Sequence, residues 1–346
     1  MIGIQPLLSI TIPTWNRASF LEGTLAQLHH ELQNVPAGGV EILVSDNCSQ
    51  DNTQAVVEQA LQSGLPLTYI RNSENIGSDA NIAQCFNLAQ GTYVLILGDD
   101  DLLVDGSLEL LLGRLASNQY GVVCLRPYGF ESDFRKECPG VGGAEKVFEN
   151  SGNFLAEIGS LITLISSCVI NKSCIGPLDA NQFCGGNLVQ VHLVIRAALN
   201  MPRNLFIKKY LVACKRNNSG GYDFSRVFVK ELGDILDKYR EMGLSSQAIS
   251  LIEQRLIIGY YPFYLFRQRI TNTGNLAETF ITFHNRFCGR LLFYIWLAPI
   301  IKLPRACAIV WGACIIMVGR SMTGDFKRGV SFAVNRLLCV NGLKHR

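Results

Sequence analysis

The sequence of 346 residues lacks the patterns that mark several other classes of protein. Its twelve cysteines form no CxxC pair, and its five histidines form no cluster with the spacing of zinc ligands. The first residues, MIGIQPLLSITIP, have neither the basic segment nor the cleavage site of a secretory signal. Internal repeats and low-complexity tracts are also missing. These absences predict a globular protein in the cytosol with reduced thiols.

Acidic residues are scarce in the last part of the chain. From Asn285 onward there are ten lysines or arginines and one acidic residue, Asp325, whereas the preceding residues carry 21 basic and 27 acidic groups. Two apolar segments in this tail, Leu291–Ile301 and Ala306–Gly319, are shorter than the roughly 20 residues that a spanning helix needs. Buried helices of a bundle, segments lying on a bilayer interface, and a re-entrant or spanning hairpin all remain open. The flanking basic groups favour the interfacial interpretation.

Strand and helix patterns alternate through the first 125 residues. Apolar, β-rich runs predict strands, and apolar residues at helical spacing predict the helices between them. The strands are expected at 7–13, 40–45, 67–71, 93–97 and 122–126, and the helices at 17–32, 51–61, 78–89 and 106–115. This alternation predicts a doubly wound α/β sheet, in which ligands bind beyond the carboxyl ends of the strands.

Three consecutive carboxylates, Asp99, Asp100 and Asp101, follow the fully apolar strand at 93–97. Like charges this close raise one another's pKa and disfavour burial, and a divalent cation removes that cost. Mg²⁺ and Mn²⁺ favour carboxylate and phosphate oxygens. An acidic turn that caps the next helix is the alternative.

Other polar residues also stand where predicted strands end. The turn after the first strand reads Pro13-Thr14-Trp15-Asn16-Arg17, and Asp46 ends the second. A carboxylate at Asp46 could accept hydrogen bonds from a nucleotide base, or it could form a simple turn. Arg17 could meet a phosphate, and backbone N–H groups of the first turn could face a base or ribose.

Together these pieces resemble family 2 glycosyltransferases with the GT-A fold. The resemblance rests on IPTWNR, VSDNCSQDNT, RNSENIGSDANIAQCFNLAQGTYVLIL and GDDD, in that order over roughly residues 7–115. It implies transfer of a sugar from a nucleotide-diphosphate donor, usually with inversion, assisted by Mg²⁺ or Mn²⁺. The implied donor-binding residues are Pro13, Thr14, Asn16, Arg17, Asp46, Asn75, Gly77, Asp79, Asn81, Asp99 and Asp100, and the implied metal ligands are Asp99, Asp100 and Asp101.

The chain departs from the family pattern at the position of the general base. Common members carry an acidic pair at the start of a helix about 90 residues after the metal motif, where this chain has GGNLVQVH (185–192). His192 and Asp179 are the titratable candidates for the base. Asn187, Gln190, Arg216 and Asn217 are predicted to contact the acceptor or a phosphate.

The stretches SSCVINKSCIGPLDANQFCGGNLVQVHLVIRAALN and VACKRNNSGGYDF resemble a narrower, abequosyltransferase-like branch that acts in bacterial O-antigen and lipopolysaccharide synthesis. This likeness implies a deoxy or dideoxy sugar donor and a lipid-diphosphate-linked oligosaccharide acceptor. We expect a GT-A domain at 1–225, with a nucleotide-sugar half at 1–126 and an acceptor half at 127–225. A helical region at 226–346 would complete a peripheral protein on the cytoplasmic face of the inner membrane.

Two other functions are alternatives. The missing acidic pair leaves room for a catalytically degenerate sugar-nucleotide-binding protein of the same pathway. A sugar-1-phosphate nucleotidyltransferase has a similar sheet, although IPTWNR is not the Gly-rich phosphate loop that such an enzyme needs. Nucleic acid is not an expected partner.

Overall fold

The structure is a computed structural model that describes residues 5–36, 38–216, 221 and 223–322. The chain forms two compact units, one comprising residues 1–222 with 241–244 and the other residues 223–240 with 245–346. Asn217 and the basic residues that follow Met322 lie outside the described residues.

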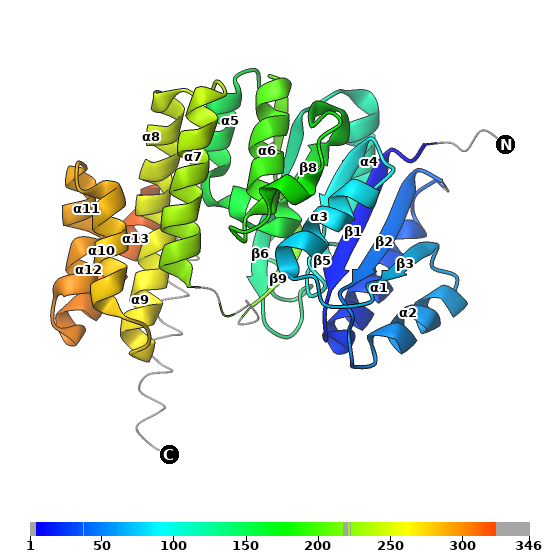
Figure 1. The fold of residues 1–346 in the computed structure, drawn as a ribbon, viewed down its shortest axis with the longest axis horizontal. Coiled ribbons are helices and arrows are strands. Elements are labelled where there is room, and N and C mark those ends of the chain that lie inside the picture. The colour runs from blue at the N-terminus through cyan, green and yellow to red at the C-terminus, as the bar shows by residue number, and fades with distance from the viewer. Residues whose placement is uncertain (1–4, 37, 217–220, 222, 323–346) are drawn as a thin grey trace, which may run out of the picture. The chain divides into compact units, whose positions relative to one another are not determined.

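The first unit begins with the predicted alternation of strands and helices (Figure 1). Its first four strands run parallel to one another in the order β3-β2-β1-β4, which confirms the doubly wound α/β prediction. The strands are β1 (Leu8–Thr14), β2 (Val40–Asp46), β3 (Leu67–Arg71) and β4 (Tyr93–Ile96), and the helices are α1 (Ala18–Leu32), α2 (Thr53–Gln62) and α3 (Ser78–Leu88).

The second half of the sheet is mixed. Beyond β4 the order continues β8-β6-β9-β5, and β7 pairs with β9. β8 lies antiparallel to both β4 and β6, so it joins the parallel half to the rest. These elements are β5 (Leu102–Leu103), α4 (Ser107–Ser117), β6 (Val122–Phe130), β7 (Lys146–Phe148), α5 (Ser151–Ile158), β8 (Cys168–Asn171), α6 (Val189–Asn200) and β9 (Asn204–Lys215). Short helical turns η1 (Gly159–Thr163), η2 (Ile165–Ser167), η3 (Lys172–Cys174) and η4 (Ala180–Phe183) flank β8.

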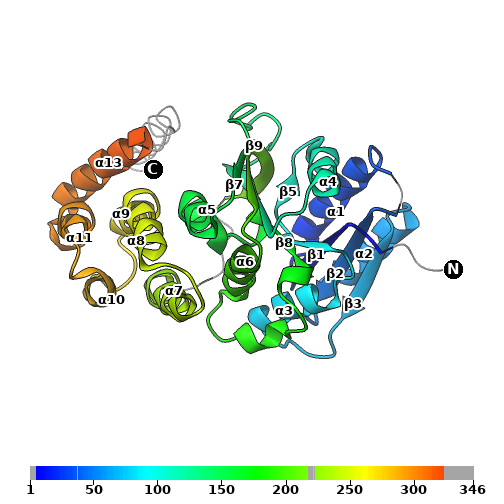
Figure 2. The same ribbon diagram turned by 90° about the horizontal axis from the view of Figure 1, so that it is seen from above.

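Helices cover both faces of this sheet. Figure 2 shows α1 and α4 on one face, and α3 and α6 on the other. The central strands between them are largely buried, and Ile10, Val44 and Leu95 belong to the central hydrophobic cluster. The chain leaves β1 toward β2 on one side, whereas β4 pairs with β1 on the other side. The carboxyl ends of β1 and β4 therefore mark the point where the strand order reverses, which is where open α/β sheets bind ligands.

The second unit is helical throughout its described part. Two π-helical turns, η5 and η6, interrupt the α-helices. Its elements are η5 (Arg226–Glu231), α7 (Leu232–Glu241), α8 (Ser246–Arg255), η6 (Leu256–Tyr260), α9 (Tyr261–Thr271), α10 (Leu276–Phe287), α11 (Leu291–Trp296), α12 (Ala298–Lys302) and α13 (Arg305–Met322). Arg286 of α10 links three of these helices by pairing with Asp237 of α7 and Glu253 of α8.

Candidate active site

The carboxylates Asp99, Asp100 and Asp101 occupy the turn between β4 and β5, beside the carboxyl end of β1. The turn is tight because the backbone N–H of Asp101 donates to the carbonyl of Gly98 at 3.1 Å. A Cβ at Gly98 would stand 3.2 Å from Asp101 Oδ2 and 3.3 Å from Asp100 Oδ1. Glycine at position 98 therefore leaves room for the carboxylates of Asp100 and Asp101 to lie close to the backbone.

Asp99 connects this turn to the loop after β1. Thr14 Oγ1 donates to Asp99 Oδ2 at 2.7 Å, and Arg17 Nε lies 3.1 Å from Asp99 Oδ1. Arg17 also donates through Nη2 to Asp100 Oδ2 at 2.7 Å. Burial raises the pKa of Asp99 to about 6, although the Arg17 guanidinium and the Thr14 hydroxyl both act to lower it.

Asp101 points to a different set of partners. Ser166 Oγ donates to its Oδ2 at 2.5 Å, and the backbone N–H of Lys215 donates to its Oδ1 at 3.3 Å. Ser166 Oγ also accepts the backbone N–H of Gly98. Burial, and then the neighbouring Asp100 carboxylate, raise the pKa of Asp101 to about 7. The side chain is only 5% exposed, so a negative charge there is poorly solvated.

Arg17 pairs with two of the three carboxylates of this turn. Of the ion pairs that the structure gives for the three carboxylates, both come from one guanidinium, that of Arg17. Asp101 takes part in neither of these ion pairs and is only 5% exposed, and burying a carboxylate without an opposite charge is expensive. The oxygen donor set and the burial of Asp99 and Asp101 suit a hard divalent cation, and the role of these residues as metal ligands stays a prediction.

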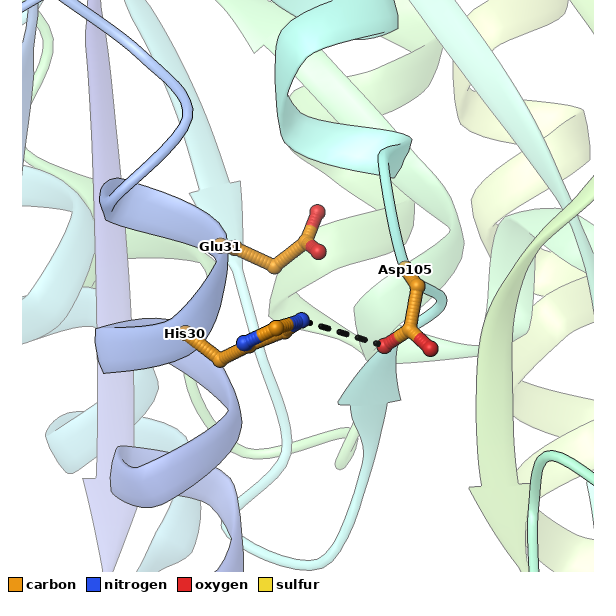
Figure 3. A group of neighbouring side chains, drawn as sticks. All are labelled: His30, Glu31 and Asp105. Atoms are coloured by element: carbon orange, nitrogen blue, oxygen red, sulfur yellow. Dashed lines mark ion pairs between the residues drawn. The ribbon is translucent and has the colours of Figure 1, made fainter.

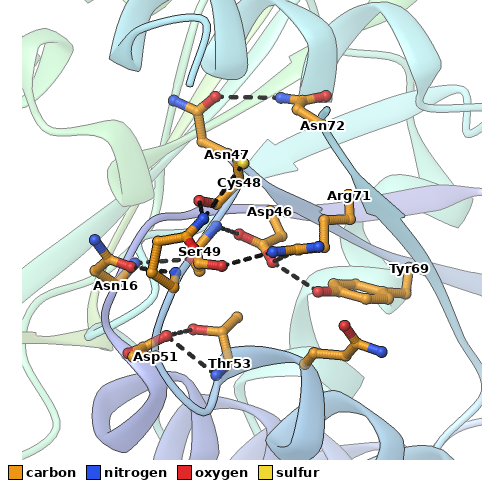
Figure 4. Close-up of polar contacts among 12 residues, drawn as sticks. Asn16, Asp46, Asn47, Cys48, Ser49, Asp51, Thr53, Tyr69, Arg71 and Asn72 are labelled. Atoms are coloured by element: carbon orange, nitrogen blue, oxygen red, sulfur yellow. Dashed lines mark hydrogen bonds and ion pairs between the residues drawn. The ribbon is translucent and has the colours of Figure 1, made fainter. Parts of the chain in front are cut away.

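Asp46, which the sequence assigns to the nucleotide base, lies fully buried at the end of β2 (Figure 4). Its Oδ1 accepts the backbone N–H of Ser49 at 2.8 Å. Its Oδ2 accepts the Tyr69 hydroxyl at 2.6 Å and lies 3.5 Å from Arg71 Nε. Burial, followed by the hydrogen bond to Asp46, raises the pKa of the Tyr69 phenol. In this structure Asp46 thus orders the loop after β2, and its contact with a base remains a prediction.

The loops after β1 and β2 are tied to each other. The backbone N–H of Asn16 donates to Ser49 Oγ, and Asn16 Oδ1 accepts the backbone N–H of Gln50 at 2.7 Å. Asn16 reaches this position through a left-handed backbone, with φ of 52°. Asp51 Oδ2 accepts the N–H of Ala18 at the start of α1. This mutual bonding holds Pro13, Thr14 and Arg17 in a fixed loop.

A second network positions the segment before α3. Asn47 Nδ2 donates to Asn75 Oδ1 at 2.7 Å, and Asn75 Oδ1 also accepts the N–H of Gly77. Gly77 has φ of 88°, a conformation that favours glycine. Asn81 is buried and bonds to both the hydroxyl and the carbonyl of Ser45. Asn75 and Gly77 thus shape an exposed loop, whereas Asn81 anchors α3 to β2.

Asp79 joins this region to the predicted acceptor segment. Its Oδ2 accepts the backbone N–H groups of Gly185 at 2.7 Å and Asn187 at 2.9 Å. Asn187 has a left-handed backbone with φ of 56°. One carboxylate therefore fixes the conformation of a segment more than a hundred residues away in the sequence.

Replacement of Asp79 by Ala is expected to loosen residues 185–187, because two backbone donors lose their acceptor. We expect faster hydrogen exchange of this segment and a free energy of unfolding lower by about 1–2 kcal/mol. Hydrogen–deuterium exchange and denaturant unfolding measure the two effects. Glu74→Ala, an exposed carboxylate in the loop before α3, is the control. Unchanged exchange at 185–187 would show that Asp79 does not hold this segment.

The two candidates for the general base lie in different environments. The ring of His192, on α6, is 9% exposed and stacks on Phe183 at a centroid distance of 4.6 Å. Asp179 caps η4 and accepts from the N–H of Asn181 and from Asn87 Nδ2. The N–H of Asn181 is the first cause that lowers the pKa of Asp179, which makes this carboxylate a weaker base.

The remaining predicted acceptor residues are Gln190 and Arg216. Gln190 Nε2 donates to the carbonyl of Thr163, and its Oε1 is buried without a hydrogen-bond partner. Arg216 follows β9, its backbone N–H donates to the carbonyl of Phe130, and its Nη1 lies 3.8 Å from Glu137. The Arg216 side chain is about half exposed, so it remains accessible to an anion.

A second cluster, His30, Glu31 and Asp105, also brings together side-chain atoms that could ligate a metal ion (Figure 3). Glu31 accepts the N–H groups of Gly106 and Leu108 at the start of α4, which makes it a cap for that helix. Asp105 accepts two hydrogen bonds from Arg135. Both carboxylates are thus already used to hold α1, α4 and a loop together.

Two residues that donate hydrogen bonds to Asp101 could not be identified from the sequence pattern. Ser166 lies in η2, just before a strand that the sequence pattern does not predict. Lys215 contributes its backbone N–H, which any residue except proline could offer. Only the pairing of β8 and β9 into the sheet brings both residues to the turn.

Comparison with known proteins agrees with this fold. Residues 9–154 match the family model described as Glycosyl transferase family 2. The abequosyltransferase RfbV of Salmonella typhimurium is 28% identical over 227 residues, which span 61% of this chain and 67% of that protein. The GalNAc(5)-diNAcBac-PP-undecaprenol beta-1,3-glucosyltransferase of Campylobacter jejuni is 33% identical over 111 residues, 32% of this chain and 35% of that protein.

Solved structures share the fold at low sequence identity. S. aureus TarS 1-349 in complex with UDP-GlcNAc has a TM-score of 0.60 and 15% identity, with 91% of both chains covered. The mannosyltransferase PcManGT of Pyrobaculum calidifontis, in complex with GDP-Man and Mn²⁺, has a TM-score of 0.54 and 17% identity, with 96% of this chain and 88% of that chain covered. The chain described here therefore carries a glycosyl transferase family 2 domain on a GT-A fold, and it is a glycosyltransferase.

Proposed function

We propose that this glycosyltransferase moves a sugar, a deoxy or dideoxy hexose, from a nucleotide-diphosphate donor to a lipid-diphosphate-linked oligosaccharide. The observation that carries the proposal is the group of three adjacent carboxylates at the switch point of the sheet, of which Asp99 and Asp101 are buried. The names of the two relatives support the choice of substrates, since one is an abequosyltransferase and the other acts on an undecaprenol-linked sugar. Synthesis of O-antigen or another surface polysaccharide is the corresponding process.

Asp99, Asp100 and Asp101 would hold the cation, Mg²⁺ or Mn²⁺. A structure of the same fold that contains Mn²⁺ and GDP-Man supports this assignment. When bound, such a cation neutralises the charge that builds on the departing diphosphate.

The loop after β1 would position the diphosphate and nucleotide. Arg17 already lies on Asp99 and Asp100, so its guanidinium is close to any phosphate that approaches these carboxylates. Thr14 holds Asp99 through its hydroxyl and fixes the orientation of that carboxylate. Pro13, Asn16 and Asp46 are proposed at the base, and Asn75, Gly77, Asp79 and Asn81 are proposed to border the ribose and donor sugar.

The acceptor side is assigned to α6 and the end of β9. The acceptor hydroxyl would attack the anomeric carbon from the face opposite the leaving diphosphate, which inverts the configuration. Between the two base candidates, the pKa of Asp179 is lowered by its hydrogen bonds, so we favour His192. Asn187, Gln190 and Arg216 are proposed to contact the acceptor or its phosphate.

Because the proposed acceptor is attached to a lipid, we also propose that the protein works peripherally on the cytoplasmic face of the inner membrane. The scarcity of acidic residues after Asn285 supports this location.

A screen of nucleotide sugars with Mn²⁺ tests the proposed function. We expect one donor to raise the melting temperature in the presence of Mn²⁺ by several degrees, because a ligand that binds only the folded chain stabilises it. The same donor should be hydrolysed slowly without acceptor and transferred rapidly to a lipid-diphosphate-linked oligosaccharide. Omission of Mn²⁺ is the matched control. If no nucleotide sugar is bound or cleaved under these conditions, the proposed function is wrong.

A further inference from the structure

The last described helix, α13, has an unusual distribution of apolar residues. It is the one helix in the described part of the chain that is long and apolar enough to cross a membrane, with a mean hydropathy of 1.4. Only 28% of its residues are buried within the protein. A helix on the surface of a soluble protein normally has one apolar face and one polar face. Much of the apolar surface of α13 therefore lies outside the protein core.

The inner face of α13 is packed closely against the rest of its unit. Its buried residues are Ala308, Gly312, Ile315, Ile316 and Gly319, which recur at helical spacing. A Cβ on Gly312 would lie 2.8 Å from the ring of Phe266 on α9. A Cβ on Gly319 would lie 2.7 Å from the carbonyl of Ile258 in η6. The backbone of α13 is thus in direct contact with its neighbours along two turns.

This packing argues against a spanning orientation. A helix that crosses a bilayer alone is surrounded by lipid on all sides. To reach that state, α13 would have to separate from α9 and η6 and expose the apolar surface that they bury together. If it stays packed, only one side of α13 is available to lipid, which suits a helix that lies parallel to the membrane surface.

The outer face of α13 is apolar as well. Val310 is 65% exposed, Val318 48% and Met322 65%. With Trp311 and the exposed Cys307 and Cys314, these residues form one stripe at spacings of three and four residues. A stripe of this kind facing water is unfavourable, and no charged side chain interrupts it within the described helix.

The charge around the stripe has one sign. Residues 291–322 contain no acidic residue, whereas Lys302, Arg305 and Arg320 lie just before α13 or at its two ends. Five more lysines or arginines and one aspartate follow in the sequence after Met322. Within the unit, Lys302 and Arg320 lie over aromatic rings of neighbouring helices and Arg305 donates to backbone carbonyls of α9, so these cations stand near the ends of the stripe rather than along it. Basic groups near an apolar face suit the anionic headgroups of a bilayer, with the apolar side chains below them.

We propose that the outer face of α13, namely Cys307, Val310, Trp311, Cys314, Val318 and Met322, is a lipid-contacting face that lies in the plane of an anionic bilayer. Exposed apolar residues of α11, Leu291, Tyr294 and Ile295, extend the apolar surface of the same unit. Both helices pack on η6 and α12, so they belong to one packed group of helices. The inference rests on the proposed function only in that a lipid-linked acceptor requires a protein at the membrane.

Flotation of the purified full chain with vesicles tests the proposal. We expect binding to vesicles of phosphatidylcholine with about 30% phosphatidylglycerol, and binding at least about tenfold weaker to pure phosphatidylcholine. Val310→Asp/Val318→Asp should weaken binding to the anionic vesicles at least about tenfold, because two charges enter the apolar stripe. Leu251→Asp/Ile281→Asp is the matched control, since both residues are exposed and apolar on other helices of the unit. It should bind like the unchanged protein.

Tryptophan fluorescence reports directly on contact between α13 and the acyl chains. Lipids brominated on the acyl chains should quench tryptophan emission in the unchanged protein, and Trp311→Phe should remove most of that quenching. The proposal is overturned if vesicles are not bound, if the α13 and control variants bind equally, or if the stripe instead mediates self-association that the Val310→Asp/Val318→Asp variant abolishes. These measurements use neither donor nor acceptor, so their failure would leave sugar transfer to a soluble acceptor analogue as a separate question.

Discussion

Asp101→Asn is expected to lower the rate of sugar transfer by about a thousandfold or more, while the protein keeps its fold. Asn has nearly the same shape as Asp and can still accept the hydrogen bond of Ser166. It lacks the negative charge, however, and a neutral amide is a much weaker ligand for Mg²⁺ or Mn²⁺. Loss of roughly 4 kcal/mol of electrostatic stabilisation in the transition state corresponds to about a thousandfold in rate.

Two measurements define this result. Transfer assays at saturating donor give the rate, and titration calorimetry with Mn²⁺ and donor gives the affinity for the cation. Asp105→Asn is the matched control, because Asp105 lies four residues away, is partly exposed and pairs with Arg135. That variant should transfer sugar within about twofold of the unchanged protein. An Asp101→Asn variant with full activity and full Mn²⁺ affinity would remove Asp101 from the metal site.

Without metal, the carboxylate turn is expected to make the fold less stable as the pH rises. Burial raises the pKa of Asp99 to about 6 and that of Asp101 to about 7. In the unfolded chain both groups return to an ordinary pKa of about 3.9. Below about pH 4 both states are protonated and these groups contribute nothing. Between about pH 4 and pH 7 the unfolded chain has lost protons that the folded chain still binds, so stability falls.

The effect is large because both groups are buried. Each unit of pKa difference corresponds to about 1.4 kcal/mol, so the two carboxylates together destabilise the metal-free fold by several kcal/mol at about pH 8. Asp99→Asn/Asp101→Asn removes both titrations. Relative to the unchanged protein, this variant should be similar in stability at about pH 4 and clearly more stable at about pH 8.

Thermal unfolding in EDTA at about pH 4.5, 6 and 8 measures this difference. Other carboxylates titrate in the same range, but they are common to both proteins and cancel in the comparison. In a parallel series without EDTA, Mn²⁺ added together with a nucleoside diphosphate should stabilise the unchanged protein more at about pH 8 than at about pH 6 and should have little effect on the variant. A stability difference that does not change with pH would show that the two carboxylates are ionised in the fold at no cost.

The parallel half of the sheet could be predicted because its signals are local. The apolar run of β4 and the helical spacing before it identify a buried strand and its helix without reference to the rest of the chain. β8 could not be predicted in this way. It has four residues, and it exists because β4 and β6 offer free edges on either side of it. Such pairing depends on residues far apart in sequence.

In the candidate site, too, some residues have a local sequence signal and others depend on distant parts of the chain. Asp99, Asp100 and Asp101 stand out in the sequence because three adjacent carboxylates after an apolar strand are costly. Ser166 does not stand out, because a serine before an apolar run is common in any protein. Asp46 was predictable as a polar residue at a strand end, but its bonds to Tyr69 and Arg71 form only once β3 lies beside β2. Sequence patterns thus locate charges well and their partners poorly.

The position of Arg17 has a consequence for the order in which ligands arrive. Its guanidinium rests on two of the same oxygens that a divalent ion would use, so a bare ion and this side chain compete for one place. An ion that comes already chelated by a nucleotide brings phosphate oxygens with it, and these give the displaced guanidinium a new acceptor. We therefore expect free Mg²⁺ to bind weakly at cellular concentrations. The ion and the nucleotide should instead bind together, as a preformed complex.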